Sequence, residues 1–141
     1  MATFNKLNGF VEHLAEKVHN LSSDQLRVAL TNSAPALTAT ADCVLANLTE
    51  VSYTNLSSRN LTIGSSAQAG GTYKLVLNDL TLTASGGPVG PFRYVYIYND
   101  TPTSPADPLI GYYDYGSSIT LNDTETLTLD FDAVNGVLTL A

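Results

Sequence analysis

From residue 59 to the end, the sequence consists almost entirely of short β-forming segments separated by turn residues. Leu, Val, Ile, Tyr and Thr fill the segments, and Gly, Asn, Asp, Ser or Pro punctuate them. This spacing leaves no room for the crossover helices of a parallel sheet and favours an antiparallel sandwich. Asn135-Gly136 before the last segment is a strong hairpin signal. The expected strands are 59–63, 73–77, 80–84, 92–98, 109–115, 118–121, 126–131 and 137–140.

Residues 4–21 predict an amphipathic helix, because apolar residues recur three or four positions apart. Thr3 can cap its first turn, and Gly9 weakens it by about 1 kcal/mol relative to Ala. The apolar stripe must pack either on the chain's own sheet or on a partner subunit. The stripe comprises Phe4, Leu7, Val11, Leu14, Val18 and Leu21.

The segment 26–31 alternates apolar and polar residues and predicts a half-buried strand, whereas 32–58 shows no period and is expected to be an irregular arm with one short strand.

A chain of 141 residues buries roughly 70% of its unfolded surface, enough for one core without disulfides. We therefore expect a single domain over residues 1–141. Its fold class is all-β, a jelly-roll-like β-sandwich built from 26–31 and 59–140, with one N-terminal α-helix.

The chain is poor in charge: 13% of its residues are charged, against about 25% in a typical domain. Such a surface is easily desolvated, which fits burial against partner proteins, although a Thr-rich β protein explains it equally well. The net charge is −7, and the six Lys and Arg residues are scattered. This argues against nucleic acid and anionic membranes as partners.

Secretion and membrane insertion are not expected. Cys43 is the single cysteine, so an intrachain disulfide is excluded. The first residues lack the apolar stretch and cleavage site of a signal peptide, and no apolar run is long enough to span a bilayer.

The sequence shows no recognisable catalytic motif. His13 and His19 are expected on different sides of the helix, both in solvent, and Cys43 has no cationic neighbour that would activate it. Asp130 and Asp132 straddle Phe131 and could bind calcium or act as an acid–base pair, but solvent-facing edge residues are the favoured interpretation. We expect no enzyme activity, no cofactor and no metal.

Six of the eight tyrosines lie within 91–116, around a loop at 99–108 that contains three prolines. Tyr94, Tyr96 and Tyr98 alternate with Val95 and Ile97 and are expected to face outward, and Tyr113 and Tyr115 share a face of the next strand. If the strands are neighbours, the rings form a patch that is cross-strand packing, a sugar platform or a protein-contact surface. The candidate contact residues are Tyr94, Tyr96, Tyr98, Pro102, Pro105, Pro108, Tyr113 and Tyr115, with Phe4, Leu7, Val11 and Leu14 of the helix.

Three stretches carry a resemblance to a known family: VHNLSSDQLRVALTNSAP, GPFRYVYIYNDTPTSPADPLIGYYDYGSSITLND and ETLTLDFDAVNGVLTL. Together they resemble small capsid decoration, or cement, proteins of tailed bacteriophages. The likeness covers residues 4–35 and 72–141, and the middle of the chain, about 36–70, matches poorly.

This resemblance implies a jelly-roll-like domain, often a homodimer, on the outer surface of the capsid in the virion. Its expected partners are the major capsid protein and a second copy of itself, and it would be made in the bacterial cytoplasm. Two alternatives stay open: a carbohydrate-binding jelly-roll module displayed on the particle, and a structural protein of the tail or head fibres.

Overall fold

The computed structural model describes residues 2–34 and 37–141, over which nine strands, one α-helix and two 3-10 helices form. The predicted all-β class with a single α-helix is confirmed. In chain order the elements are β1 (Phe4–Lys6), α1 (Asn8–Ala15), β2 (Leu26–Thr31), the 3-10 helices η1 (Thr40–Asp42) and η2 (Leu45–Asn47), β3 (Ile63–Ala69), β4 (Thr72–Leu77), β5 (Leu80–Thr83), β6 (Val89–Asn99), β7 (Leu109–Leu121), β8 (Thr126–Leu129) and β9 (Leu138–Leu140).

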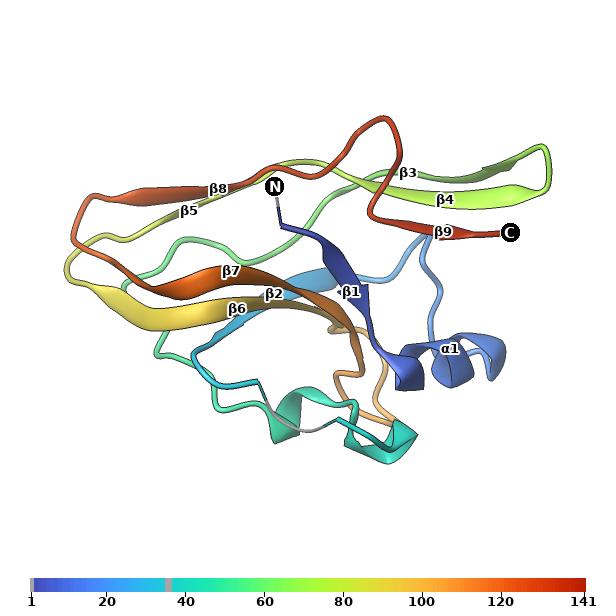
Figure 1. Ribbon diagram of the computed structural model, residues 1–141, viewed down its shortest axis with the longest axis horizontal. Coiled ribbons are helices and arrows are strands. Elements are labelled where there is room, and N and C mark those ends of the chain that lie inside the picture. The colour runs from blue at the N-terminus through green and yellow to red at the C-terminus, as the bar shows by residue number, and fades with distance from the viewer. Residues whose placement is uncertain (1, 35–36) are drawn as a thin grey trace.

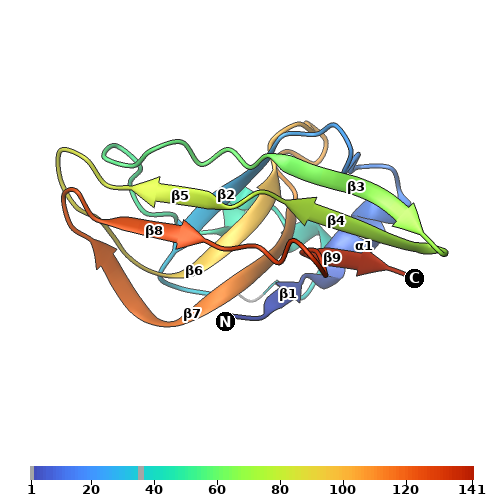
Figure 2. The same cartoon turned by 90° about the horizontal axis from the view of Figure 1, so that it is seen from above.

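The strands form two layers (Figure 1). The first layer is a four-stranded antiparallel sheet in the order β1-β7-β6-β2. The second combines a three-stranded sheet, β3-β4-β9, with the two-stranded sheet β5-β8. Because β4 runs on into β5 and β8 runs on toward β9, the second layer is a long ribbon that bends where the two sheets meet (Figure 2).

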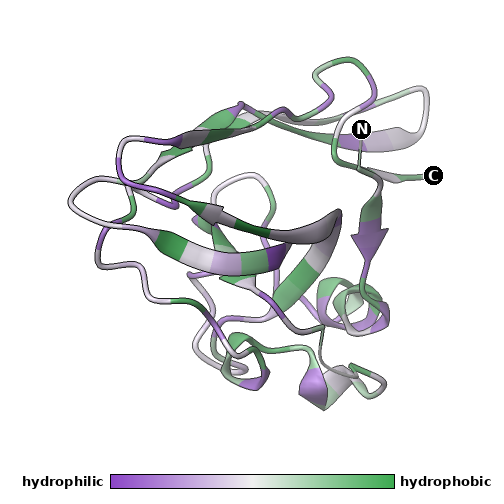
Figure 3. Cartoon of the chain, turned by 60° about the vertical axis from the view of Figure 1, so that its left-hand side comes forward, coloured by the Kyte–Doolittle hydropathy of each residue, from purple (hydrophilic) through white to green (hydrophobic). Residues whose placement is uncertain are grey.

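Apolar side chains fill the space between the layers. Hydrophobic and hydrophilic residues alternate along parts of the strands (Figure 3). Leu75 and Leu77 of β4 and Leu82 of β5 face the first sheet and are buried. Phe10 of α1 joins this core, so the helix packs on its own chain. A third apolar cluster lies on the opposite face of the first sheet, beneath the segment 37–48.

The predicted helix over 4–21 is wrong at both ends. Phe4–Lys6 forms β1 and pairs with β7, and Leu7, not Thr3, is the N-cap. The helix ends after Ala15, because Lys17 takes a left-handed backbone (φ 70°) and the Val18 amide donates to the His13 carbonyl at 2.9 Å. The apolar residues of 4–21 are therefore not on one helix face: they belong successively to a strand, a short helix and a loop.

Gly9 has a packing role inside this short helix. A Cβ at Gly9 would lie 2.6 Å from the Sγ atom of Cys43, which is buried. Glycine therefore allows α1 to approach the 37–48 segment, and this contact offsets its low helix propensity.

Several strand predictions also need correction. Of the segment 59–63, only Ile63 belongs to a strand, as the first residue of β3, and Asn60 forms an isolated bridge with Arg27. The segments 109–115 and 118–121 are one continuous strand. Strand β2 was predicted to be half-buried but is covered on both faces.

The Asn135-Gly136 signal does not make a hairpin, since β8 and β9 belong to different sheets. Asp132 closes this turn instead. Its Oδ1 atom accepts the amides of Val134 and Asn135 at 2.9 and 2.8 Å. These hydrogen bonds, led by that of the Asn135 amide, lower the pKa of Asp132.

Candidate functional site

The six clustered tyrosines are divided between the two faces of one sheet. Strands β6 and β7 are neighbours, as the sequence suggested, but the register places Tyr96 opposite Tyr112 and Val95 opposite Tyr113. Tyr113 and Tyr115 therefore face the second layer, away from the tyrosines of β6. The predicted single patch of five rings does not form.

The expected exposure of the β6 tyrosines is wrong. Tyr96 and Tyr98 are only 1% and 2% exposed, and Tyr94 is half-buried. Tyr96 stacks on Tyr112 with ring centroids 5.0 Å apart, and burial, followed by the proximity of Tyr112, raises the pKa of Tyr96 to about 12. These rings belong to the apolar cluster on the face of the first sheet that points away from the second layer, and we call this cluster the second core.

The segment predicted to be an irregular arm is the cover of this core. Cys43 and Leu48 are buried against the tyrosines, as is Leu7 from the start of α1. Backbone hydrogen bonds fasten the cover to β7 and to the end of the 99–108 loop. The Leu109 amide donates to the Cys43 carbonyl at 2.8 Å, and the Leu45 amide donates to the Asp107 carbonyl at 2.9 Å. The predicted arm 32–58 thus packs on its own chain through residues 37–48, and its Pro35 and Ala36 lie outside the described residues.

The proline loop is similarly attached. Pro108 is buried, and Pro102 and Pro105 are half-buried. Asp100 lies 3.4 Å from Arg27, and the Thr101 hydroxyl accepts the Gln25 amide at 2.9 Å. The loop therefore presents only part of its surface, and its role in protein contact stays a prediction.

The remaining candidates differ in exposure. Phe4 and Leu14 are half-buried, whereas Val11 is 49% exposed on the outer side of α1. Tyr113 packs between Phe4 and Phe131, with ring centroids 5.3 and 6.1 Å away. Of the predicted tyrosines, only Tyr115 is exposed, with 53% of its surface accessible to solvent.

Tyr115 lies on a groove of about 190 Å³ along the side of the sandwich, where β7 meets β8. Leu127, Leu129 and Phe131 line the groove, together with Thr128. It is an apolar surface accessible to solvent, next to an unusual face of the second layer.

That face consists of threonines. The inward residues of β5 and β8 are leucines, and the outward residues are Thr81, Thr83, Thr126 and Thr128. The register places Thr81 opposite Thr128, and their hydroxyls are 3.0 Å apart. We call these four threonines the threonine face. Sequence reasoning treated LTLT and TLTL only as strand signals, although their alternation already placed the threonines on one side.

Charge is sparse on the rest of this layer's outer side. The outward residues of β3, β4 and β9 are small or uncharged except Lys74, whose Nζ donates to the Val134 carbonyl at 2.7 Å. Asp79 and Asp130 are exposed at the bend between the two sheets, and Asp79 Oδ1 accepts the Phe131 amide at 2.9 Å.

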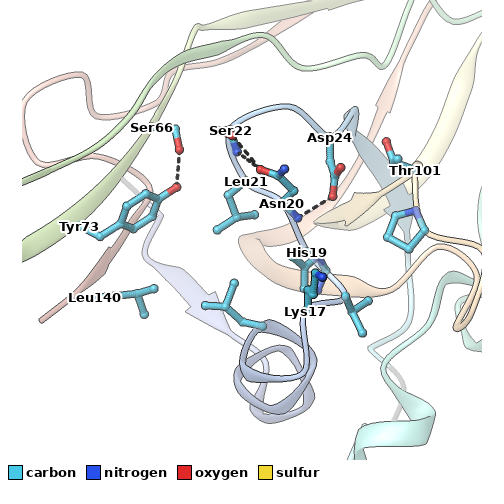
Figure 4. Close-up of a pocket in the computed structure, with 13 residues that line it drawn as sticks. Lys17, His19, Asn20, Leu21, Ser22, Asp24, Ser66, Tyr73, Thr101 and Leu140 are labelled. Atoms are coloured by element: carbon cyan, nitrogen blue, oxygen red, sulfur yellow. Dashed lines mark hydrogen bonds between the residues drawn. The ribbon is translucent and has the colours of Figure 1, made fainter.

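A cavity lies between α1 with its following loop and the β3-β4-β9 sheet (Figure 4). It measures about 650 Å³ and opens between the segment 17–24 and the inner side of the β3-β4-β9 sheet. Leu14, Val18 and Leu140 contribute apolar walls. On one side the Tyr73 hydroxyl bonds to the Ser66 hydroxyl at 2.9 Å.

A buried polar cluster borders this cavity. His13 and His19 were predicted to face solvent on different sides of a helix, but they are only 6% and 7% exposed, with ring centroids 6.2 Å apart. The correction follows from the helix ending early, which folds His19 back over Phe10 and α1. The Asn99 side-chain amide donates to Asp24 Oδ2 at 2.6 Å and lies 3.1 Å from His19 Nδ1.

This geometry holds His19 in its neutral form. Asn99 is oriented because its Oδ1 accepts the Thr101 amide at 3.1 Å, so its amide nitrogen faces the imidazole. Burial, and next the neighbouring His13, lower the pKa of His19 to about 4, although the Asp24 carboxylate opposes the shift. A neutral imidazole in this position orders the loop and is a poor general base.

We predict that His19 makes the fold sensitive to acid. The unfolded chain protonates this residue near pH 6.5 and the folded chain only near 4, so stability is full above pH 6.5 and falls between these values. The loss amounts to about 3 kcal/mol, since one pKa unit corresponds to about 1.4 kcal/mol. Urea unfolding across this range should show the slope, and His19→Asn should flatten it. An equal slope in the variant would contradict this role.

The acidic residues do not assemble into a metal centre. No group of three or more His, Cys, Asp or Glu among residues 2–34 and 37–141 has the geometry to hold an ion. Asp130 is exposed, while Asp132 closes a turn. Cys43 lies on the buried inner side of the 37–48 cover, and burial raises the pKa of its thiol. Within the described part of the chain, no helix is both long and apolar enough to cross a bilayer.

Comparison with known proteins adds no relative: no family model, no curated protein and no solved structure matches this chain.

Proposed function

We propose that this chain is a structural virion protein: a decoration, or cement, protein that binds the outside of an icosahedral phage head. Its partner would be the major capsid protein, whose subunit contacts it would stabilise. The support from the sequence is the resemblance to such proteins in the segments 4–35 and 72–141.

The observation that carries the proposal is the threonine face with Tyr115 beside it. Thr81, Thr126 and Thr128 are exposed on two paired strands, and the four side chains of the face bear no charge. Docking a protein against such a face requires the desolvation of hydroxyls only, and these can exchange hydrogen bonds with the partner. Tyr115 supplies an exposed ring of the kind enriched at the centres of interfaces.

The mechanism is mechanical and thermodynamic. A rigid body bound across the joint between two capsid subunits adds its binding free energy to that needed to open the joint. A standard interface of about 1,600 Å² in total is large enough for stable binding. The net charge of −7 would be repelled by packaged DNA, which favours the outer side of the shell.

The proposal is tested by adding the purified protein to phage heads that lack it. We expect saturable binding by co-sedimentation, at a fixed number of copies per head, and a higher temperature for release of the packaged DNA. Heads that neither bind the protein nor gain resistance to heat would contradict the proposal.

A further inference from the structure

Strand β3 forms an open edge of the second layer. The sheet order is β3-β4-β9, so β3 pairs with β4 on one side, and no described strand pairs with it on the other. The β3-β4 hairpin extends beyond the first layer at one end of the molecule (Figure 1). Its outer edge is therefore accessible to another strand.

The hairpin turn determines which backbone groups point away from β4. Gly70 and Gly71 both have positive φ (60° and 84°), as a two-residue hairpin turn requires, and Ala69 pairs with Thr72. In such a hairpin the residues flanking the turn bond to each other, and successive residues alternate in direction. The amides and carbonyls of Ser66 and Gln68 consequently point away from β4, in the plane of the sheet, toward its free edge.

This edge lacks the features that usually prevent strand association. Lysine, proline and inward-pointing charges protect most natural edges. The sequence of Ile63–Ala69, IGSSAQA, contains none of them, and its one irregularity, between Ile63 and Ser65, leaves Ser65–Ala69 regular.

We propose that β3 pairs with β3 of a second copy of this chain, antiparallel about a two-fold axis. Ala67 would lie opposite its own counterpart, and Ser66 would exchange backbone hydrogen bonds with Gln68 of the second copy. We favour a second copy as the partner of this edge. The chain has a net charge of −7, but β3 itself carries no charged residue, so two copies can pair at β3 without direct charge repulsion.

The side chains permit this approach. Ser65, Ala67 and Ala69 share the outer side of the strand and are small, so those of the two copies meet without obstruction. On the inner side, the Ser66 hydroxyl is already bonded to Tyr73. The pairing creates a continuous sheet in the order β9-β4-β3-β3-β4-β9.

A two-fold axis perpendicular to this sheet places both threonine faces on the same side. If the proposed function holds, the dimer therefore attaches to one shell at two points, and the second contact forms at high effective concentration. The pairing of β3 does not itself depend on that function.

Sedimentation equilibrium tests the pairing without phage heads. The wild-type chain, of 15.0 kDa, should have the mass of two chains. Gln68→Pro removes the backbone N–H of residue 68, which points to the free edge of β3, and should shift the mass to that of one chain. Gln68→Ala loses the same side-chain bond to Gly71 but keeps the amide, and should remain dimeric. Circular dichroism verifies that each variant is folded.

A second variant does not depend on proline. Ala67→Cys should form a disulfide-linked dimer under mild oxidation, whereas wild-type protein should not, because Cys43 is fully buried. A monomeric wild-type chain, a folded Gln68→Pro variant that stays dimeric, or an Ala67→Cys variant that does not cross-link would overturn the proposal.

Discussion

Replacement of Tyr96 with Ala is expected to reduce the free energy of unfolding by about 3–5 kcal/mol, the range for truncating a buried large aromatic side chain. Tyr96 is 1% exposed, stacks on Tyr112, and is enclosed by Cys43 and the rest of the 37–48 cover. The truncation leaves a cavity between the first sheet and the 37–48 segment that covers it. Urea or thermal unfolding gives the difference directly.

Tyr115→Ala is the matched control. It makes the same change on the neighbouring strand at a ring that is 53% exposed, and we expect an effect within about 0.5 kcal/mol. If the Tyr96 variant were as stable as the Tyr115 variant, the second core beneath the 37–48 segment would be contradicted.

Lysines on the threonine face are expected to weaken the binding of the protein to phage heads strongly. In the double variant Thr81→Lys and Thr128→Lys, two ammonium groups must be desolvated on docking, without carboxylates built to receive them. A penalty of about 3 kcal/mol weakens binding roughly 100-fold. Co-sedimentation with heads, at a series of protein concentrations, measures the change in affinity.

The control places the same charges elsewhere. Thr38 and Thr120 are exposed threonines outside the threonine face, and their replacement with Lys adds an equal charge to the chain. We expect the control to bind heads with nearly wild-type affinity, and both doubles to unfold at similar temperatures. Equal loss of binding in the two doubles would mean that net charge matters and that the threonine face does not.

Alternation of residues predicted the strands well but not which of their faces are covered. The pattern of β6 correctly placed Tyr96 and Val95 on opposite sides. It could not show that both sides are buried, because the cover comes from the segment 37–48, whose short 3-10 helices have no period to detect. Amphipathic alternation indicates one buried face only where the other meets water.

Tertiary contacts also overrode local preference at the N-terminus. The apolar spacing of 4–21 is helical, yet β1 pairs with β7 and the helix stops before Lys17. That ending brings His13 and His19 together, a juxtaposition that helical geometry over 4–21 would forbid. Strand β3 was missed for a different reason: Ser, Ala and Gly have low β propensity, and only pairing with β4 makes the segment a strand.

The candidate surface was accordingly predicted only in part. Tyr115 was identified and is exposed, whereas the threonine face was visible in the sequence as alternating Leu and Thr but was not assigned a role. Its position beside Tyr115 depends on β8 lying along β7 across the groove, a contact between the two layers that the sequence does not specify.

Electron cryomicroscopy of heads bound to the purified protein tests the central claim most directly. The account predicts density for the chain on the outer surface, across the joints between major capsid protein subunits, with β5, β8 and Tyr115 turned toward the shell. Density that leaves the threonine face in solvent, or heads without any bound chain at saturating concentration, would contradict it.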